Sequence, residues 1–187
     1  PMWSALEWVL RMAKESPAEY LTDAVLPKGL TSFPLRGHFF DMVGFRSEDG
    51  VVYLADCLSS KETLEKYQIG VIYDVGAYLD TLEQVKQLSA TWFVPAHAEA
   101  TQDIAPLAQY NIDKTREVAE TILTFCAEPI GFEALLQKLF TAYGLTMDFS
   151  QYVLVGSTVR SYLAWLKDQG ALSVDFATRI PLWHRVG

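Results

Sequence analysis

The sequence predicts an α+β protein, because it contains both short strand-like runs and longer helix-like patterns. Two apolar runs, residues 51–54 and 92–95, are rich in β-branched and aromatic side chains, which is typical of buried strands. The Asp49-Gly50 pair before the first run is a strong hairpin signal. Apolar residues recur at helical spacing over residues 74–88 and 104–126, so these stretches should form helices.

The composition is that of a globular protein with a substantial core. Of the 187 residues, 50% are hydrophobic and 13% are aromatic, which argues against a disordered chain. No apolar run approaches the roughly 18 residues that a membrane span needs, and the first residues lack the basic start of a signal peptide. The two cysteines, Cys57 and Cys126, are too few for a disulfide framework. We therefore expect a cytoplasmic protein with reduced, buried thiols and no membrane partner.

The net charge of −8 belongs to the first part of the chain. From residue 128 onward, five basic residues balance five acidic ones, so the whole excess lies in residues 1–127. An acidic body disfavours nucleic acid as a partner, because non-specific binding depends on neutralising phosphates. The charge still permits a local site where metal ions supply the positive charge.

The chain should begin with two helices. Ser16-Pro17-Ala18-Glu19 is a capping box, which starts the second helix at Pro17. Two tryptophans in this region, Trp3 and Trp8, either line a substrate pocket or fill a core. The first helix spans residues 2–14, with an apolar stripe of Leu6, Val9, Leu10 and Ala13.

Metal-capable side chains occur beside the expected strands. His38 lies in a turn, and residues 39–43 should form a strand that pairs with the first apolar run through the Asp49-Gly50 turn. Asp56 and His97 each follow one of the two apolar runs by one or two residues. Because a hairpin leaves and returns at the same end, His38 and Asp56 should lie close together. Imidazole and carboxylate groups are ligands that zinc accepts.

Each of these residues also has a simpler explanation. A histidine at a strand end is usually a satisfied loop residue, and an aspartate after a strand usually caps a turn or a helix. The order and context of all three residues together favour a metal site over three separate structural roles.

Further elements follow the hairpin. Residues 59–67 should form a short helix or a loop. Asp74 is the expected N-cap of the helix over residues 74–88. The long helix over residues 104–126 is either continuous or broken near Asn111.

Glu128-Pro129 is expected to separate two domains, residues 1–127 and residues 128–187. In the second domain, amphipathic helices are predicted at residues 132–140 and 153–168, with Gly170 ending the latter. A hairpin should follow, formed by residues 172–176 and 180–183.

Helices followed by a hairpin resemble a winged helix. A helix that reads DNA should be basic, yet residues 157–168 carry only Arg160 and Lys167 as basic residues. We therefore expect a packing or oligomerisation role for this domain. His184, near its end, should face the solvent.

The order Gly37-His38, then Ala55-Asp56, then Pro95-Ala96-His97 resembles the C-terminal half of the metallo-β-lactamase superfamily, over roughly residues 30–126. The resemblance implies an α+β fold that is one half of an αββα sandwich, followed by a small winged-helix-like helical module. It implies zinc as the cofactor, with His38 and His97 on different metals and Asp56 as the bridging and catalytic carboxylate. In that family a hydroxide held between two metals attacks an ester, thioester, amide or phosphodiester.

The sequence departs from the family pattern in three ways. Phe39-Phe40-Asp41 follows His38, where many members have a small hydroxyl residue, proline and glycine. Ala55 precedes the bridging aspartate, where many members have glycine. The family's His-x-His-x-Asp-His motif is missing, because the three histidines stand at positions 38, 97 and 184.

The sequence therefore predicts a metallo-β-lactamase-like hydrolase whose active site is incomplete in this chain, acting on a small-molecule substrate that it does not identify. A fragment of this kind should be close to inactive. The alternative from a different class is a non-catalytic association module, which forms a homodimer or pairs with the missing N-terminal half. A winged-helix nucleic-acid binder is the third and weakest alternative.

Overall fold

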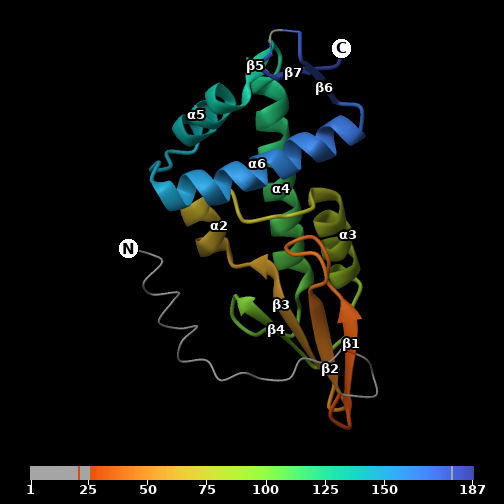
Figure 1. The fold of residues 1–187 in the computed structure, drawn as a ribbon. Coiled ribbons are helices and arrows are strands. Elements are labelled where there is room, and N and C mark those ends of the chain that lie inside the picture. The colour runs from red at the N-terminus through yellow and green to blue at the C-terminus, as the bar shows by residue number, and fades with distance from the viewer. Residues whose placement is uncertain (1–20, 22–25, 178) are drawn as a thin grey trace, which may run out of the picture.

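The computed structural model describes residue 21, residues 26–177 and residues 179–187. The helices expected over residues 2–14 and from Pro17 lie outside these described residues. In Figure 1, the long helix α4 (Ala105–Phe125) runs from a four-stranded sheet at one end of the molecule to a three-stranded sheet at the other. The α+β prediction is confirmed.

The larger sheet has the strand order β1 (Leu30–Pro34), β2 (Val43–Ser47), β3 (Val51–Ser59) and β4 (Trp92–His97). The first three strands are antiparallel neighbours, whereas β3 and β4 are parallel. The predicted hairpin connects β2 to β3. Its turn contains Gly50 at φ +84, a left-handed conformation that glycine adopts without steric cost.

The strand expected at residues 39–43 is wrong. Strand β2 begins only at Val43, and residues 37–41 form bends and a turn instead. Gly37 has φ +117, so the chain turns sharply there. The apolar side chains of Phe39 and Phe40 are both exposed, so their pattern does not mark a half-buried strand.

Two helices cover one face of the larger sheet. Helix α3 (Val75–Lys86) and helix α4 both contact β3, and α3 also packs along α4. The residues on that face of β3 and β4 are fully buried, namely Val52, Leu54 and Phe93. Asp74 is the N-cap of α3, as predicted, because its side chain accepts a hydrogen bond from the N–H of Ala77 at 2.9 Å.

Two further helices within residues 1–127 also follow the sequence patterns closely. The segment of residues 59–67 contains helix α2 (Lys61–Tyr67), with Ser60 as its N-cap. Helix α4 is continuous, so the alternative break near Asn111 is wrong. The side chain of Asn111 is buried and forms hydrogen bonds with the backbone of Ser59.

The second half contains α5 (Phe132–Ala142) and α6 (Phe149–Asp168), followed by the paired strands β6 (Leu172–Asp175) and β7 (Leu182–Arg185). The predicted hairpin is confirmed, although β7 begins two residues later than expected, after a proline that has no N–H to donate. Helix α6 begins four residues earlier than predicted, because Asp148 caps it. Strand β5 (Ile130–Gly131) joins β7 at the other side and was not predicted.

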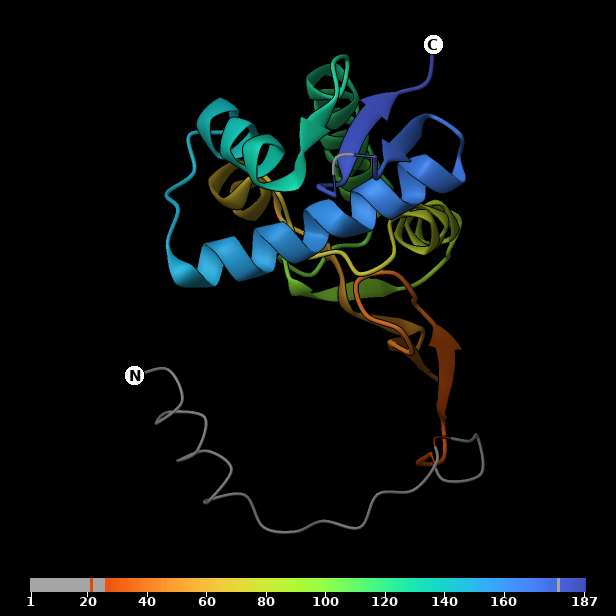
Figure 2. The ribbon, with the colours of Figure 1, turned by 45° about the horizontal axis from the view of Figure 1, so that its top comes forward.

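One buried hydrophobic cluster extends through both halves. Figure 2 shows α6 lying across the molecule in front of α4, and α6 contacts both α3 and α4. Cys57 and Cys126 belong to this cluster as free, buried thiols, as predicted. The division of the chain into domains at residues 127 and 128 stays a prediction. Within the described part of the chain, no helix is long and apolar enough to cross a membrane.

A buried asparagine ties helix α4 to the end of strand β3. The side-chain oxygen of Asn111 accepts the N–H of Ser59 at 3.0 Å, and its amide nitrogen donates to the carbonyl of Ser59 at 2.9 Å. The hydroxyl of Tyr78 on α3 also donates to Asn111, at 3.3 Å. This single side chain therefore holds two helices and the strand that carries Asp56 in one arrangement.

We expect Asn111→Ala to lower the free energy of unfolding by about 2 kcal/mol, because it leaves the backbone groups of Ser59 without partners. Urea denaturation followed by circular dichroism measures the change. Glu120→Ala, an exposed change on the same helix, is the control and should alter stability by less than about 0.5 kcal/mol. Equal effects of the two changes would contradict the role assigned to Asn111.

Candidate metal centre

His38 is positioned by the backbone of the preceding glycine. The carbonyl of Gly37 accepts hydrogen bonds from the N–H groups of Tyr73 at 2.9 Å and Asp74 at 3.0 Å. A Cβ at Gly37 would lie 2.2 Å from the backbone nitrogen of Tyr78, so only glycine fits there. The loop that carries His38 is thereby fastened to the N-terminal end of α3.

Asp56 is positioned by an irregularity in β3. The prediction that Asp56 lies beyond a strand end is wrong, because β3 continues to Ser59. The pairing of β3 with β4 shifts register on both sides of Ala55, and Ala55 has φ +47. Such a bulge bends the strand and re-aims the side chains that follow it. It lets Asp56 face the open end of the sheet while its neighbour Cys57 is buried.

His97 is the last residue of β4, rather than a residue beyond the strand end as expected. Its backbone carbonyl accepts the N–H of Ser60 at 2.9 Å, so the end of β4 remains attached to the end of β3. Its side chain is 55% exposed, and the parallel pairing brings it to the same end of the sheet as Asp56.

The structure brings all three predicted residues together. Nε2 of His97 lies 3.4 Å from Oδ1 of Asp56, and Nε2 of His38 lies 3.9 Å from Oδ2 of the same carboxylate. Each carboxylate oxygen therefore faces a different imidazole. The side chains of His38 and Asp56 are 28% and 41% exposed, so the group is open to solvent.

The donor chemistry fits part of a zinc site. Two ligands about 2.0–2.1 Å from one tetrahedral zinc ion lie about 3.3 Å apart, close to the separation of His97 from Asp56. The separation of His38 from Asp56 would need to shrink slightly. Among the residues that the structure describes, however, no three His, Cys, Asp or Glu side chains are arranged to hold one ion together. Each imidazole is thus paired with one carboxylate oxygen, which is fewer donors than a zinc ion needs.

Two further polar groups lie near this centre, the thiol of Cys57, which is neutral, and the ammonium of Lys114, which is paired within the protein. Burial, followed by the charge of Asp56, raises the pKa of the Cys57 thiol to about 12, so it is not an available thiolate. A narrow pocket of about 40 Å³ leads inward from His38 and Asp56 to Lys114 on α4.

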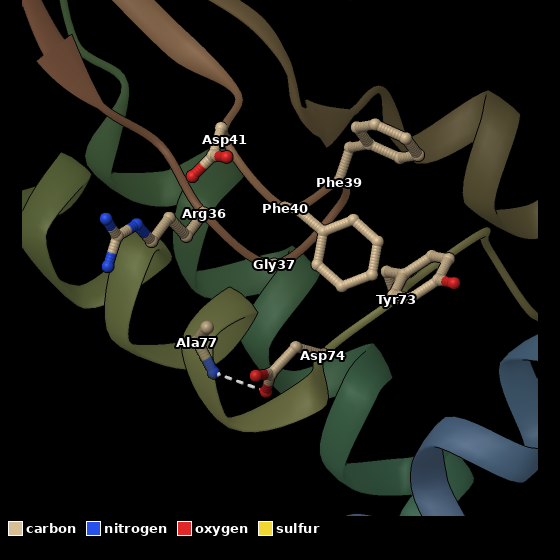
Figure 3. A pocket seen from close by; sticks show the side chains of 8 residues that line it. All are labelled: Arg36, Gly37, Phe39, Phe40, Asp41, Tyr73, Asp74 and Ala77. Carbon is tan, nitrogen blue, oxygen red and sulfur yellow. Dashed lines mark hydrogen bonds between the residues drawn. The ribbon is translucent and has the colours of Figure 1, made fainter.

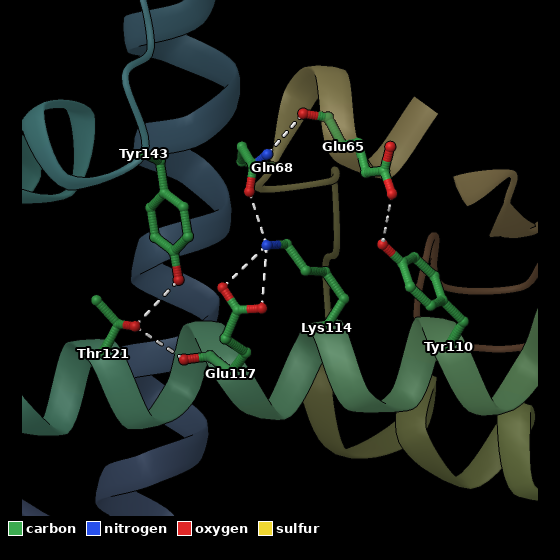
Figure 4. Close-up of polar contacts among 7 residues, drawn as sticks. All are labelled: Glu65, Gln68, Tyr110, Lys114, Glu117, Thr121 and Tyr143. Carbon is green, nitrogen blue, oxygen red and sulfur yellow. Dashed lines mark hydrogen bonds and ion pairs between the residues drawn. The ribbon is translucent and has the colours of Figure 1, made fainter. Parts of the chain in front are cut away.

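The ammonium group of Lys114 is satisfied within the protein. Figure 4 shows it between Gln68 and Glu117, at 2.7 Å from the amide oxygen of Gln68 and 2.9 Å from the nearer carboxylate oxygen of Glu117. It also lies over the ring of Tyr143, 5.1 Å from its centre. Because its charge is balanced, Lys114 does not turn the narrow pocket into an anion site.

Sequence patterns missed an aromatic contact between the loop that follows His38 and the segment that precedes α3. Tyr73 lies against Phe40, with ring centres 4.1 Å apart, although these residues are far apart in the sequence. Phe39 was noticed only as part of an expected strand and as a departure from the family pattern after His38. No sequence pattern links Tyr73 to the loop after His38, because their contact depends on the hydrogen bonds that the carbonyl of Gly37 accepts.

Comparisons with known structures identify the fold. A metallo-beta-lactamase family protein from Thermus thermophilus aligns with a TM-score of 0.68 at 17% identity, covering 98% of this chain and 65% of that chain. A beta-lactamase domain protein from Burkholderia ambifaria aligns with a TM-score of 0.67 at 16% identity, covering 98% of this chain and 60% of that chain. The chain therefore has the metallo-β-lactamase fold and spans less than two thirds of either protein. The sequence matches no protein-family model and no curated protein.

The left-handed conformation of Ala55 leads to a stability prediction. A side chain at positive φ is strained by roughly 1–2 kcal/mol, whereas glycine is not. We expect Ala55→Gly to raise the free energy of unfolding by about 0.5–1 kcal/mol, after the entropic cost of glycine is subtracted. Chemical denaturation measures the change. Ala96→Gly, in the neighbouring strand β4 and not at positive φ, is the matched control and should lower stability. A loss of stability in both variants would show that the bulge is not strained.

Proposed function

We propose that this chain carries part of the active site of a metallo-β-lactamase-fold hydrolase that cleaves an ester, thioester, amide or phosphodiester. The observation that carries the proposal is the position of Asp56 between His38 and His97, with one carboxylate oxygen toward each ring. Zinc ions bound there would lower the pKa of a water molecule and polarise the scissile bond. The metallo-β-lactamase fold supports this assignment.

Each residue has a defined role in the proposal. Asp56 would offer one carboxylate oxygen to each ion. His38 and His97 act as neutral imidazoles that donate through Nε2, the atom that each directs at Asp56. The partial exposure of all three side chains leaves room for substrate on the open side.

The proposed centre needs ligands from outside the described residues. A catalytic zinc ion takes about three protein ligands and keeps one open position. Here one imidazole and one carboxylate oxygen serve each ion, so each is at least one ligand short. We propose that a segment corresponding to the N-terminal half of the sandwich supplies the remaining donors, and that the chain without that segment hydrolyses substrates close to the background rate.

We also propose that residues 128–187 form a winged-helix-like module used for packing. The guanidinium of Arg160, one of the two basic side chains on the second half of α6, lies 3.6 Å from the centre of the Phe132 ring. It also donates to the carbonyl of Gly156 at 3.2 Å. Because this cation is engaged within the module, it is poorly placed to bind a nucleic-acid phosphate.

The metal centre predicts weak, specific zinc binding by the chain as it stands. Isothermal titration should give a dissociation constant weaker than micromolar, because each ion lacks at least one ligand. Asp56→Asn should weaken binding by about tenfold or more, since it removes a ligand common to both ions. His184→Gln, which changes a histidine in strand β7, is the control and should bind zinc normally. Two tightly held ions, or equal losses in both variants, would contradict this arrangement.

A second candidate function is association through the face of the larger sheet that is turned away from α3 and α4. Phe45, Tyr53 and Val94 lie opposite one another across β2, β3 and β4, on the face turned away from α3 and α4. Trp92 lies beside them, opposite Val51. Tyr53 and Trp92 are 44% and 43% exposed, which is an apolar surface of the kind that pairs with another protein surface.

If this face associates, the chain should form a homodimer at micromolar concentration. Sedimentation velocity should then show a dimer that the double change Tyr53→Lys and Trp92→Lys returns to the monomer, because two buried lysines would be unpaired. The control is Phe176→Lys, an exposed apolar residue that follows β6. A monomeric parent chain would exclude self-association through this face.

A further inference from the structure

Three aromatic side chains form an exposed cluster between the loop that follows His38 and the segment that precedes α3. Phe39, Phe40 and Tyr73 are 58%, 56% and 48% exposed, yet each ring contacts the other two. The centre-to-centre distances are 5.5 Å between the two phenylalanines, 5.8 Å from Phe39 to Tyr73 and 4.1 Å from Phe40 to Tyr73. Figure 3 shows the rings along one side of a cavity of about 500 Å³.

The backbone holds this cluster in place. The carbonyl of Gly37 accepts the N–H of Tyr73 and of Asp74, so the loop that carries the phenylalanines is fixed to the segment that carries the tyrosine. The hydroxyl of Thr81 on α3 donates to the carbonyl of Arg36 at 2.7 Å, which fastens the loop a second time. Rings that are already positioned lose little conformational freedom when a ligand binds.

The cluster has no evident role in stability. Its rings leave about half of their surface in water, so they contribute little to the buried core. A cavity of about 500 Å³ lies in the range that binds small molecules, and aromatic side chains are common in the walls of such sites. The arrangement therefore fits a ligand-binding surface better than a packing surface.

The charges around the cavity disfavour an anionic ligand. Arg36 and Asp41 lie on the side away from Tyr73 in Figure 3 and contribute opposite charges. One carboxylate oxygen of Asp74 already accepts the N–H of Ala77. The rings are thus the feature that distinguishes this cavity, and they favour a flat group that can pack against Phe40 and Tyr73.

We propose that this cavity binds an aromatic ring of a small-molecule ligand through Phe40 and Tyr73, with Phe39 closing one side. The planes of Phe40 and Tyr73 are inclined by 56°, so the bound ring stacks on one of them and meets the other edge-on. His38 directly precedes Phe39 in the chain, and its own ring is directed at Asp56. If the cavity and the metal centre serve one substrate, the hydrolase prefers aryl substrates, a step that rests on the proposed function.

The test uses 2-naphthol as the probe and its fully saturated analogue, decahydro-2-naphthol, as the matched comparison. Both are titrated into the full chain in the presence of a chelator, and backbone amide shifts report the site. Naphthol should shift the amides of Gly37, Phe40 and Tyr73. It should bind about tenfold more tightly than the saturated analogue, because only the flat aromatic molecule can stack.

The variant Phe40→Leu keeps an apolar side chain but removes the ring, so naphthol should bind about tenfold more weakly. Phe176→Leu is the control, because Phe176 is 63% exposed and lines a different cavity. Equal binding of the two probes, shifts elsewhere on the protein, no binding, or an equal loss in the control would each overturn the proposal.

The same experiment separates this proposal from the proposed hydrolase. Because the chelator removes metal, a failure of naphthol binding leaves the zinc titration unaffected as a test of the metal centre. Conversely, His97→Gln should weaken zinc binding while naphthol still binds. A loss of naphthol binding in His97→Gln would overturn the assignment of the ring site to Phe40 and Tyr73.

Discussion

The carbonyl group of Gly37 is the constraint on which the candidate site depends. It accepts two backbone N–H groups from the segment before α3, and this fixes the loop between β1 and β2 against the helix. A glycine is required there, because φ is +117 and the neighbouring backbone leaves no room for a Cβ. The next residue, His38, is thereby aimed at Asp56. Without this attachment the loop would be an exposed connection, and neither the histidine nor the rings after it would have a defined place.

The second constraint is the bulge at Ala55, which breaks the regular alternation of β3. In a regular strand, alternate side chains share a face, so after the buried Val52 and Leu54 the side chain of Asp56 would also point into the core. The register shift lets Asp56 leave the sheet at its open end while Cys57 and Leu58 remain in the core. The strained conformation is therefore linked to the position of the carboxylate. Asn111 stabilises the same strand from the other side through its bonds to Ser59.

The sequence predicts the parts of this structure that depend on local rules. The Asp49-Gly50 turn, the Asp74 cap and the apolar stripe of α4 each follow from a few neighbouring residues. The strand expected after His38 was wrong because two distant N–H groups, not the local apolar pattern, decide the path of that loop. Strand β5 consists of two residues and is defined by its pairing with β7, so no hydrophobic periodicity could predict it.

In the candidate site too, features set by neighbouring residues were predicted, whereas contacts between residues far apart in the sequence were not. The order of His38, Asp56 and His97 along the chain was visible, and the hairpin alone placed the first two at one end of the sheet. Tyr73 was not visible, because its contact with Phe40 depends on the fastening of the loop to α3. Within that short loop, His38 turns toward β3 while Phe40 turns toward Tyr73. One backbone attachment therefore positions a metal ligand and an aromatic wall side by side, and each can be altered through its own side chain without disturbing the other.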